Sequence, residues 1–126
     1  MSTTDVREYR AEARSTETFG RVLCDARHHH FVVDGPVQNG CPGEAVTPAE
    51  IFLAGIAACG VELVQAIARD SHVALRAVHV DARGTLDRSR PPREDLSVFN
   101  AVHLTFVLAG VATAAAYELV AAFKRR

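Results

Sequence analysis

The segment Val46–Glu62, with the sequence VTPAEIFLAGIAACGVE, decides the fold of this chain. It opens with a helix start signal, because Thr47 can cap the helix and Pro48 suits the first helical turn. Glu50 then completes an S/T-x-x-E capping box. We therefore predict a helix that begins here and runs to about Asp70.

The first half of this helix is uncharged. Residues 51–61 contain no charged or amide side chain, whereas Glu62, Gln65 and Arg69 make the second half amphipathic. A helix that is apolar all round is typical of one that is buried on every side. Because a small domain rarely surrounds a helix by itself, we expect a partner subunit to cover it.

Alternating apolar residues and turn residues predict strands on both sides of the helix. Residues 4–14 predict an edge strand, although their Ala, Glu and Arg also suit a helix. The Gly/Pro-rich residues 34–48 are too broken for either period and predict a loop. Further strands are expected over residues 19–26, 28–33, 75–84 and 98–108, followed by an alanine-rich helix after Gly110. This order indicates an α+β fold.

Length and charge limit the class of protein. With 126 residues and 48% apolar content, the chain fits one domain that spans residues 1–126. Its 14 basic and 15 acidic residues form no basic block, which argues against a nucleic-acid binder. The charged N-terminus lacks the apolar core of a signal peptide, and no unbroken apolar run reaches the roughly 18 residues of a membrane span. We expect a soluble, cytoplasmic protein with no membrane partner.

Cys59 is the candidate nucleophile. The three cysteines, Cys24, Cys41 and Cys59, form no CxxC pair, which argues against a disulfide scaffold and a four-ligand zinc site. Small neighbours in the sequence AACG leave room for a group to approach the Cys59 sulfur. A free cysteine also serves as a small packing residue. A reactive thiol needs a cation or donor nearby, and no cation lies within one helical turn of Cys59 in the sequence.

Glu50 is the nearest informative acid. Nine helical positions separate it from Cys59, which places the two on opposite faces and about 13.5 Å apart along the helix axis. One straight helix therefore keeps them apart. If both serve one site, the acid comes from a second copy of the chain, or the helix breaks near Gly55. The alternative role of Glu50 is to close the capping box.

Arginine side chains are the remaining candidates for an electrostatic role in the site. Thirteen of the fourteen basic residues are Arg. Arg14 and Arg21 lie on early predicted strands, from which a guanidinium can reach a carboxylate or an oxygenated substrate. Exposed arginine is nevertheless the norm in proteins.

The histidines do not predict a metal centre. Of the three consecutive histidines, only His28 and His30 can share one face of a strand, and two ligands do not make a zinc site. A solvated strand or a pH-sensitive contact is the simpler interpretation. His79 and His103 are expected on the polar faces of their strands, facing each other across the ladder. No metal and no cofactor is predicted.

The stretch DGPVQNGCPGEAVTPAEIFLAGIAACGVELV, residues 34–64, resembles the OsmC/Ohr family of thiol peroxidases and their OsmC-like relatives. Members share a Gly/Pro-rich loop, a T/N-P helix opening with an acid, and an apolar helix with a reactive cysteine after two small residues. Thr47, Pro48, Glu50 and Cys59 match these features here. The order of strands and helices matches over nearly the whole chain.

The resemblance implies an intertwined homodimer with an antiparallel sheet, two central long helices and active sites at the subunit interface. In such enzymes the cysteine, here Cys59, attacks the O–O bond of an organic hydroperoxide and becomes a sulfenic acid. Arg and Glu side chains hold the thiolate and polarise the peroxide. A second cysteine then forms a disulfide, which a dithiol reductant of lipoyl or other type reopens. The implied role is defence against oxidative or osmotic stress.

Three departures from the family pattern stand out. The family's second cysteine follows the Lys-containing end of the last helix, and no cysteine occurs there before Arg126, so either the chain is truncated or the protein lacks the partner thiol. Glu50 stands two residues after the proline, as in OsmC-like members. The family arginine aligns loosely, with Arg21 as first choice and Arg14 as second. These departures favour the generic OsmC-like branch over a complete organic hydroperoxide reductase. Cys41 is then the candidate resolving thiol, provided that its Cα lies within about 7 Å of its partner's.

The sequence therefore predicts a cysteine-dependent peroxidase with Cys59 as nucleophile, Glu50 of the neighbouring subunit as acid, and Arg21 or Arg14 as electrostatic partner. One alternative is a non-catalytic dimer in which Cys59 only packs and an apolar cleft binds a small ligand. The other is a redox sensor that becomes sulfenylated without turnover.

Overall fold

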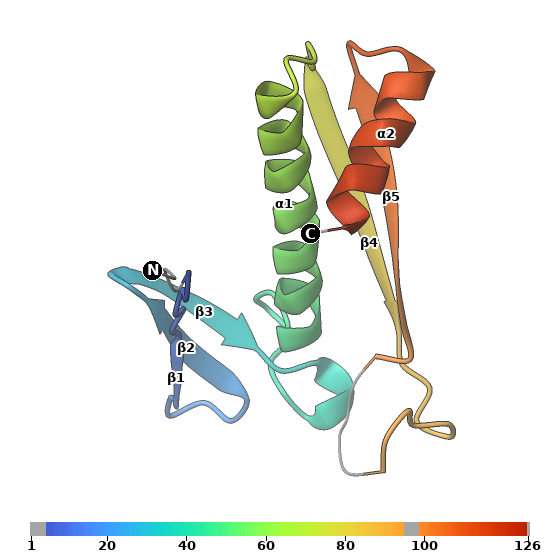
Figure 1. The fold of residues 1–126 in the computed structure, drawn as a ribbon. Coiled ribbons are helices and arrows are strands. Elements are labelled where there is room, and N and C mark those ends of the chain that lie inside the picture. Colours follow the sequence, from blue (N-terminus) through green and yellow to red (C-terminus); the bar gives the residue numbers. More distant parts are fainter. Residues whose placement is uncertain (1–4, 95–98, 126) are drawn as a thin grey trace. The chain divides into compact units, whose positions relative to one another are not determined.

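The computed structural model describes residues 5–94 and 99–125, and the chain divides into two compact units, Met1–Ile51 and Phe52–Arg126. Unit 1 contains β1 (Glu12–Ser15), β2 (Arg21–Ala26), β3 (His29–Asp34), the short 3-10 helix η1 (Val37–Asn39) and the start of α1 (Pro48–Asp70) (Figure 1). Unit 2 contains the rest of α1, then β4 (Ala77–Thr85), β5 (Ala101–Ala109) and α2 (Thr113–Lys124). This order confirms the predicted α+β class.

Unit 1 is built on a three-stranded antiparallel sheet in the order β1-β2-β3. The turn between β2 and β3 occupies only two residues, and Arg27 adopts a left-handed φ of 56° there. A positive φ is typical of such short hairpin turns, because its twist matches that of the strands. The short turn sets the register, so that Arg21 at the start of β2 lies directly opposite Asp34 at the end of β3.

The predicted edge strand is much shorter than expected. The prediction covered residues 4–14, whereas β1 spans only Glu12–Ser15 and the described residues before it form no strand. The reason is the length of β2, since Glu12 already lies opposite Asp25, one residue before that strand ends. Only Ala11 still has a β2 residue, Ala26, to lie opposite, and the residues before it have no β2 backbone left to pair with.

Unit 2 has a core formed between its helices and its hairpin. Val64, Ile67 and Ala68 of α1 and Leu119 of α2 are buried together. Alternate residues of β4 and β5 pack against them, including Val78, Phe106 and Leu108. Figure 1 shows α1 and α2 beside the β4–β5 ribbon. The apolar residues of the period-two strand pattern and of the helical pattern thus pack into one cluster.

A glycine allows α1 to approach this hairpin closely. Gly60 is buried, and a Cβ added there would lie 3.4 Å from the Phe106 ring and 3.5 Å from Val80. A larger side chain would push the helix away from the hairpin. Gly60 therefore determines which side of α1 faces β4 and β5, and Cys59 beside it is exposed.

The two strand histidines do not face each other. His79 lies opposite Val107, and His103 lies opposite Arg83, so the prediction of a His79–His103 pair was wrong. The register of the β4–β5 ladder places them four residues apart along it. Both histidines are exposed, as their polar strand faces indicate.

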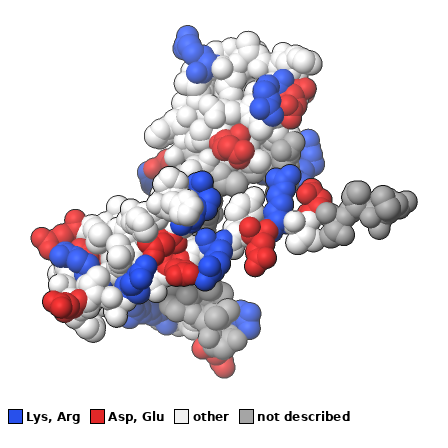
Figure 2. Space-filling view, turned by 90° about the vertical axis from the view of Figure 1, so that its left-hand side faces the viewer, with Lys and Arg blue, Asp and Glu red and all other residues white. Residues whose placement is uncertain are grey.

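The first half of α1 is not covered within a single chain. Ile51 is 36% exposed and Phe52 is 55% exposed, and Ala54, Gly55 and Ala58 are exposed as well. Much of the surface of unit 2 seen in Figure 2 is uncharged, whereas unit 1 shows intermingled basic and acidic side chains. One chain therefore does not surround this half of α1, as expected for a small domain, and cover by a partner subunit stays a prediction.

By length and composition, α1 is also apolar enough to cross a membrane, and 22% of its most apolar 18-residue stretch is buried. Core helices of soluble proteins share this length and composition.

Leu119→Ala should destabilise the protein by about 2–5 kcal/mol, because it removes a 4% exposed side chain from the core and leaves a cavity. Leu86→Ala is the matched control, since Leu86 is 46% exposed, and it should cost under about 0.5 kcal/mol. Urea denaturation followed by circular dichroism measures both values. Equal losses in the two variants would contradict the assigned core.

Candidate functional site

Cys59 lies in the middle of α1 and is exposed. Among the residues that the structure describes, none forms a hydrogen bond or ion pair with its sulfur. The neighbouring turns offer Gly55 and Leu63 at i±4 and Glu62 at i+3, none of which is a cation. Within one chain, the thiol is therefore accessible but lacks the positive partner that would favour its thiolate.

Glu50 closes the capping box at the start of α1. Its Oε1 accepts hydrogen bonds from the Thr47 backbone N–H at 3.0 Å and from the Thr47 hydroxyl at 2.9 Å. In return, the Glu50 N–H donates to Thr47 Oγ1 at 3.3 Å. The backbone N–H of Thr47, followed by its hydroxyl, lowers the pKa of Glu50. The structural role predicted for Glu50 is confirmed.

The helix itself separates Glu50 from Cys59. Because α1 is a single α-helix from Pro48 to Asp70, a break near Gly55 is excluded. Nine positions of regular helix keep the two side chains on opposite faces. Of the two ways in which both residues can serve one site, only the contribution of a second copy of the chain remains.

Arg21 is held by two carboxylates. Its Nε donates to Asp34 Oδ1 at 2.8 Å and its Nη2 to Asp34 Oδ2 at 3.0 Å, which makes a bidentate pair. Nη2 also donates to Glu44 Oε1 at 2.7 Å. Asp34 above all, and Glu44 to a lesser degree, raise the pKa of Arg21, so the guanidinium stays charged.

Asp34 is the anchor of this cluster. It is fully buried, and its Oδ2 also accepts the backbone N–H groups of Glu44 and Ala45, each at 2.9 Å. Arg21 first, and then the N–H groups of Ala45 and Glu44, lower the pKa of Asp34 to about 2 against the cost of burial. One buried carboxylate thus fixes the plane of Arg21 and ties the loop that leads into α1 to the sheet.

Arg14, the second candidate arginine, belongs to a different cluster. It pairs with Asp25, whose other oxygen binds His30 Nδ1. His30 above all, and also Arg14, lower the pKa of Asp25. His30 is therefore occupied by a carboxylate, and the described residues contain no group of three or more His, Cys, Asp or Glu side chains arranged to bind a metal.

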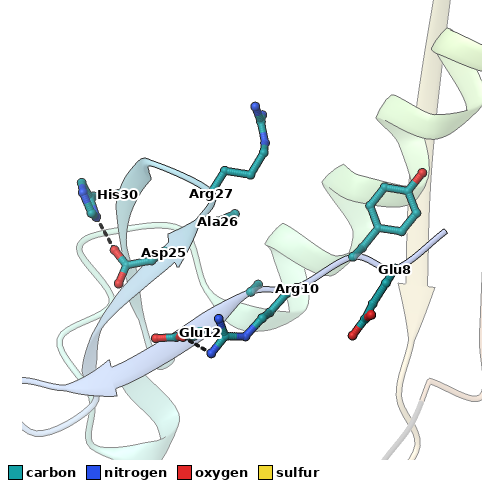
Figure 3. Close-up of a pocket in the computed structure, with 9 residues that line it drawn as sticks. Glu8, Arg10, Glu12, Asp25, Ala26, Arg27 and His30 are labelled. Atoms are coloured by element: carbon teal, nitrogen blue, oxygen red, sulfur yellow. Dashed lines mark hydrogen bonds and ion pairs between the residues drawn. The ribbon is translucent and has the colours of Figure 1, made fainter.

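A groove of about 930 Å³ lies beside this second cluster. Figure 3 shows that His30 turns toward Asp25 and Arg10 toward Glu12, while the Arg27 side chain extends away from both pairs. Two pairs of these groups, Arg10 with Glu12 and His30 with Asp25, are bound to each other. Arg14 and Arg21 are thus bound by different carboxylates, Asp25 and Asp34.

Cys41 is half-buried against two glycines. A Cβ added at Gly20 or at Gly35 would overlap its sulfur, so the thiol fills the space that these glycines leave free. The sulfur must leave this packing to join a disulfide. Cys24 is half-buried in β2, opposite Phe31.

Sequence reasoning missed Asp34 and Glu44 as partners of Arg21. The sequence predicts both residues only as parts of the Gly/Pro-rich loop 34–48. The register of a two-residue hairpin, which places Arg21 opposite Asp34, contained a signal for the first pair. No local pattern indicates the contact of Glu44, because it depends on how the loop folds back.

Comparison with known proteins places the chain among those with this fold. A family model described as OsmC-like protein matches residues 41–126. An OsmC-like protein from Mycoplasma pneumoniae matches with a TM-score of 0.80 at 14% identity, over 98% of this chain and 84% of that chain. No curated protein matches the sequence.

Two further solved structures are similar. An organic hydroperoxide resistance protein OsmC from Legionella pneumophila gives a TM-score of 0.68 at 24% identity, over 94% of this chain and 82% of that one. An organic hydroperoxide resistance protein from Elizabethkingia anophelis, with thiocyanate bound, gives a TM-score of 0.72 at 18% identity, over 94% of this chain and 82% of that one. At these identities the likeness shows the fold.

The low pKa of Asp34 predicts a specific loss of stability in acid. Its native pKa of about 2 lies below the unfolded value of about 3.9, so its contribution is complete above pH 4 and is lost as the pH falls toward 2. Asp34→Asn should lower the stability at neutral pH and flatten this acid dependence. Urea midpoints measured from pH 2 to 7 test this prediction.

The other carboxylates with lowered pKa values, Asp25, Glu50 and Asp87, are present in both proteins. The difference between the two pH profiles therefore isolates Asp34. Parallel profiles for the two proteins would show that its carboxylate is not the anchor described here.

Proposed function

Because the chain belongs to the OsmC-like protein family, we propose that it is a cysteine-dependent peroxidase that reduces organic hydroperoxides. The observation that carries this proposal is Cys59, an exposed thiol among small residues in the middle of an apolar helix. The similar proteins from Legionella pneumophila and Elizabethkingia anophelis are named organic hydroperoxide resistance proteins, which supports the same substrate class here. Defence against oxidative stress is the corresponding role.

The oxidative step would proceed at the Cys59 sulfur. The thiolate attacks the terminal oxygen of R–O–O–H, an S–O bond forms, and the O–O bond breaks. Cys59 becomes a sulfenic acid, and the leaving alkoxide RO⁻ takes up one proton to become the alcohol ROH. The exposed sulfur and its small neighbours Ala58 and Gly60 leave space for this approach.

The reductive step would use an external dithiol. One thiol condenses with the sulfenic acid, which releases water and forms a mixed disulfide with Cys59. The second thiol of the reductant then displaces Cys59 and leaves as the cyclic disulfide. Cys41 is the internal candidate for the first of these reactions, although its packing against Gly20 and Gly35 favours the external route.

The acid and the cation would act across a homodimer interface. In a single chain, the first half of α1 exposes the apolar side chains of Ile51 and Phe52. This exposure supports the proposal that a second copy of the chain covers it. Since the helix is unbroken, Glu50 would come from the partner subunit. Arg21 is the preferred electrostatic partner, because the buried Asp34 carboxylate holds its guanidinium in one orientation, whereas the Arg14 side chain is 63% exposed. A fixed guanidinium would stabilise the thiolate and the developing alkoxide.

A second candidate function rests on the surroundings of Cys59. Because no described residue supplies a cation to the sulfur within the chain, a non-catalytic dimer that binds a small apolar ligand is the alternative. A redox sensor is a third reading, and it would form the sulfenic acid without turnover. Peroxide consumption with and without a dithiol distinguishes the three.

Excess dithiothreitol should support consumption of cumene hydroperoxide by the wild-type chain, and Cys59→Ser should abolish it by removing the nucleophile. Cys24→Ser is the matched control and should retain turnover, because Cys24 lies in β2. One equivalent of consumption without further turnover would indicate the sensor. No consumption by the wild-type chain would contradict the peroxidase and favour the binding dimer.

Analytical ultracentrifugation should give twice the chain mass of 13.6 kDa, because the exposed face of α1 requires cover. Phe52→Glu should shift the protein to monomer or aggregate, since it places a charge on that face. Val6→Glu is the control, as Val6 is 78% exposed and lies outside α1. A monomeric wild type, or a dimer that persists in Phe52→Glu, would contradict this assembly.

A further inference from the structure

The Arg21 cluster carries more negative than positive charge. One guanidinium is bound by two carboxylates, Asp34 at 2.8 Å and Glu44 at 2.7 Å. With each group ionised, the cluster has a net charge of −1. A cation compensated in this way attracts further anions weakly, because each new negative charge also meets the second carboxylate.

The two carboxylates differ in how firmly they are held. Asp34 is fully buried and accepts two bonds from Arg21 and two from backbone N–H groups. The Glu44 side chain is 75% exposed, and among the described residues its carboxylate bonds only Arg21 Nη2. Asp34 therefore belongs to the framework, whereas Glu44 adds a charge at the solvent side of the guanidinium that the fold does not require.

Part of Arg21 remains available to a substrate. The bonds to Asp34 and Glu44 use Nε and Nη2, and no described residue accepts a hydrogen bond from Nη1. The side chain is 32% exposed. A substrate oxygen bound at the Nη1 donors would therefore lie close to the negative charge of Glu44, whose carboxylate is 2.7 Å from Nη2 of the same guanidinium.

We propose that Glu44 is a specificity-determining residue of this site, which selects uncharged organic hydroperoxides against anionic ones. This inference rests on the proposed function, in which Arg21 acts on the peroxide. A neutral hydroperoxide meets Arg21 as a hydrogen-bond donor and is little affected by Glu44. Glu44 repels a hydroperoxide that carries a carboxylate, and this repulsion grows as the distance between the two negative charges falls.

Glu44→Gln is the variant that isolates the charge. Glutamine keeps the size of the side chain and an amide oxygen that can accept the bond from Nη2, so Arg21 keeps its orientation. Because the pair is exposed, the expected effect is modest, about two- to fivefold. It should also shrink as salt is added, since exposed charges are screened over about 10 Å at 0.1 M ionic strength.

The test compares cumene hydroperoxide with its para-carboxylate, two substrates that share one reacting centre and differ in charge. Stopped-flow measurement of Cys59 oxidation gives a rate constant for each. The ratio of the anionic to the neutral rate constant should rise about two- to fivefold in Glu44→Gln at low salt and approach the wild-type ratio at high salt. Glu8→Gln is the charge-matched control, because Glu8 lines the separate groove beside Asp25 and His30.

The outcomes separate this inference from the proposed function. If the wild-type chain oxidises Cys59 with cumene hydroperoxide and the ratio rises in Glu44→Gln alone, the selection is supported. If the wild type reacts but Glu44→Gln and Glu8→Gln have the same ratio, Glu44 does not select and the peroxidase stands. If the wild type reacts with neither substrate, the peroxidase fails and the inference falls with it.

Discussion

The apolar first half of α1 is the constraint on which the rest of the structure depends. Residues 51–61 carry no charge, and a single chain leaves Phe52 more than half exposed. Exposed apolar surface is typical of interaction sites, since water is a poor solvent for it, and this supports the proposed partner subunit. The same helix carries Cys59, and Glu50 closes the capping box at its start. The exposed apolar residues and the candidate catalytic residues therefore belong to one helix.

A second constraint acts on the polar side of the candidate site. Removing a carboxylate from water is costly unless it is fully hydrogen-bonded, and Asp34 meets this condition with four donors. Those donors come from Arg21 and from the loop before α1. The buried charge therefore aligns an arginine and positions a loop with one set of bonds. A fold can hold a guanidinium rigidly in this way without a large core around it.

Local sequence patterns were sufficient to predict most of the helices and strands and part of the candidate site. The capping box and the uncharged run predict α1, because capping and apolar patterning are local properties. Alternation predicts β4 and β5 but not their register, which explains the wrong His79–His103 pairing. The contact of Glu44 with Arg21 joins residues 23 positions apart through an irregular loop, whose path depends on tertiary hydrogen bonds.

The central claim is that one site draws its thiol and its acid from two copies of the chain. Mixing and re-equilibrating Cys59→Ser with Glu50→Gln tests it, because a mixed dimer pairs the intact Cys59 of one chain with the intact Glu50 of the other. If each variant alone is inactive, the mixture should recover about a quarter of wild-type peroxidase activity, since half of the dimers are mixed and each has one complete site. A mixture no more active than its separate components would contradict the account.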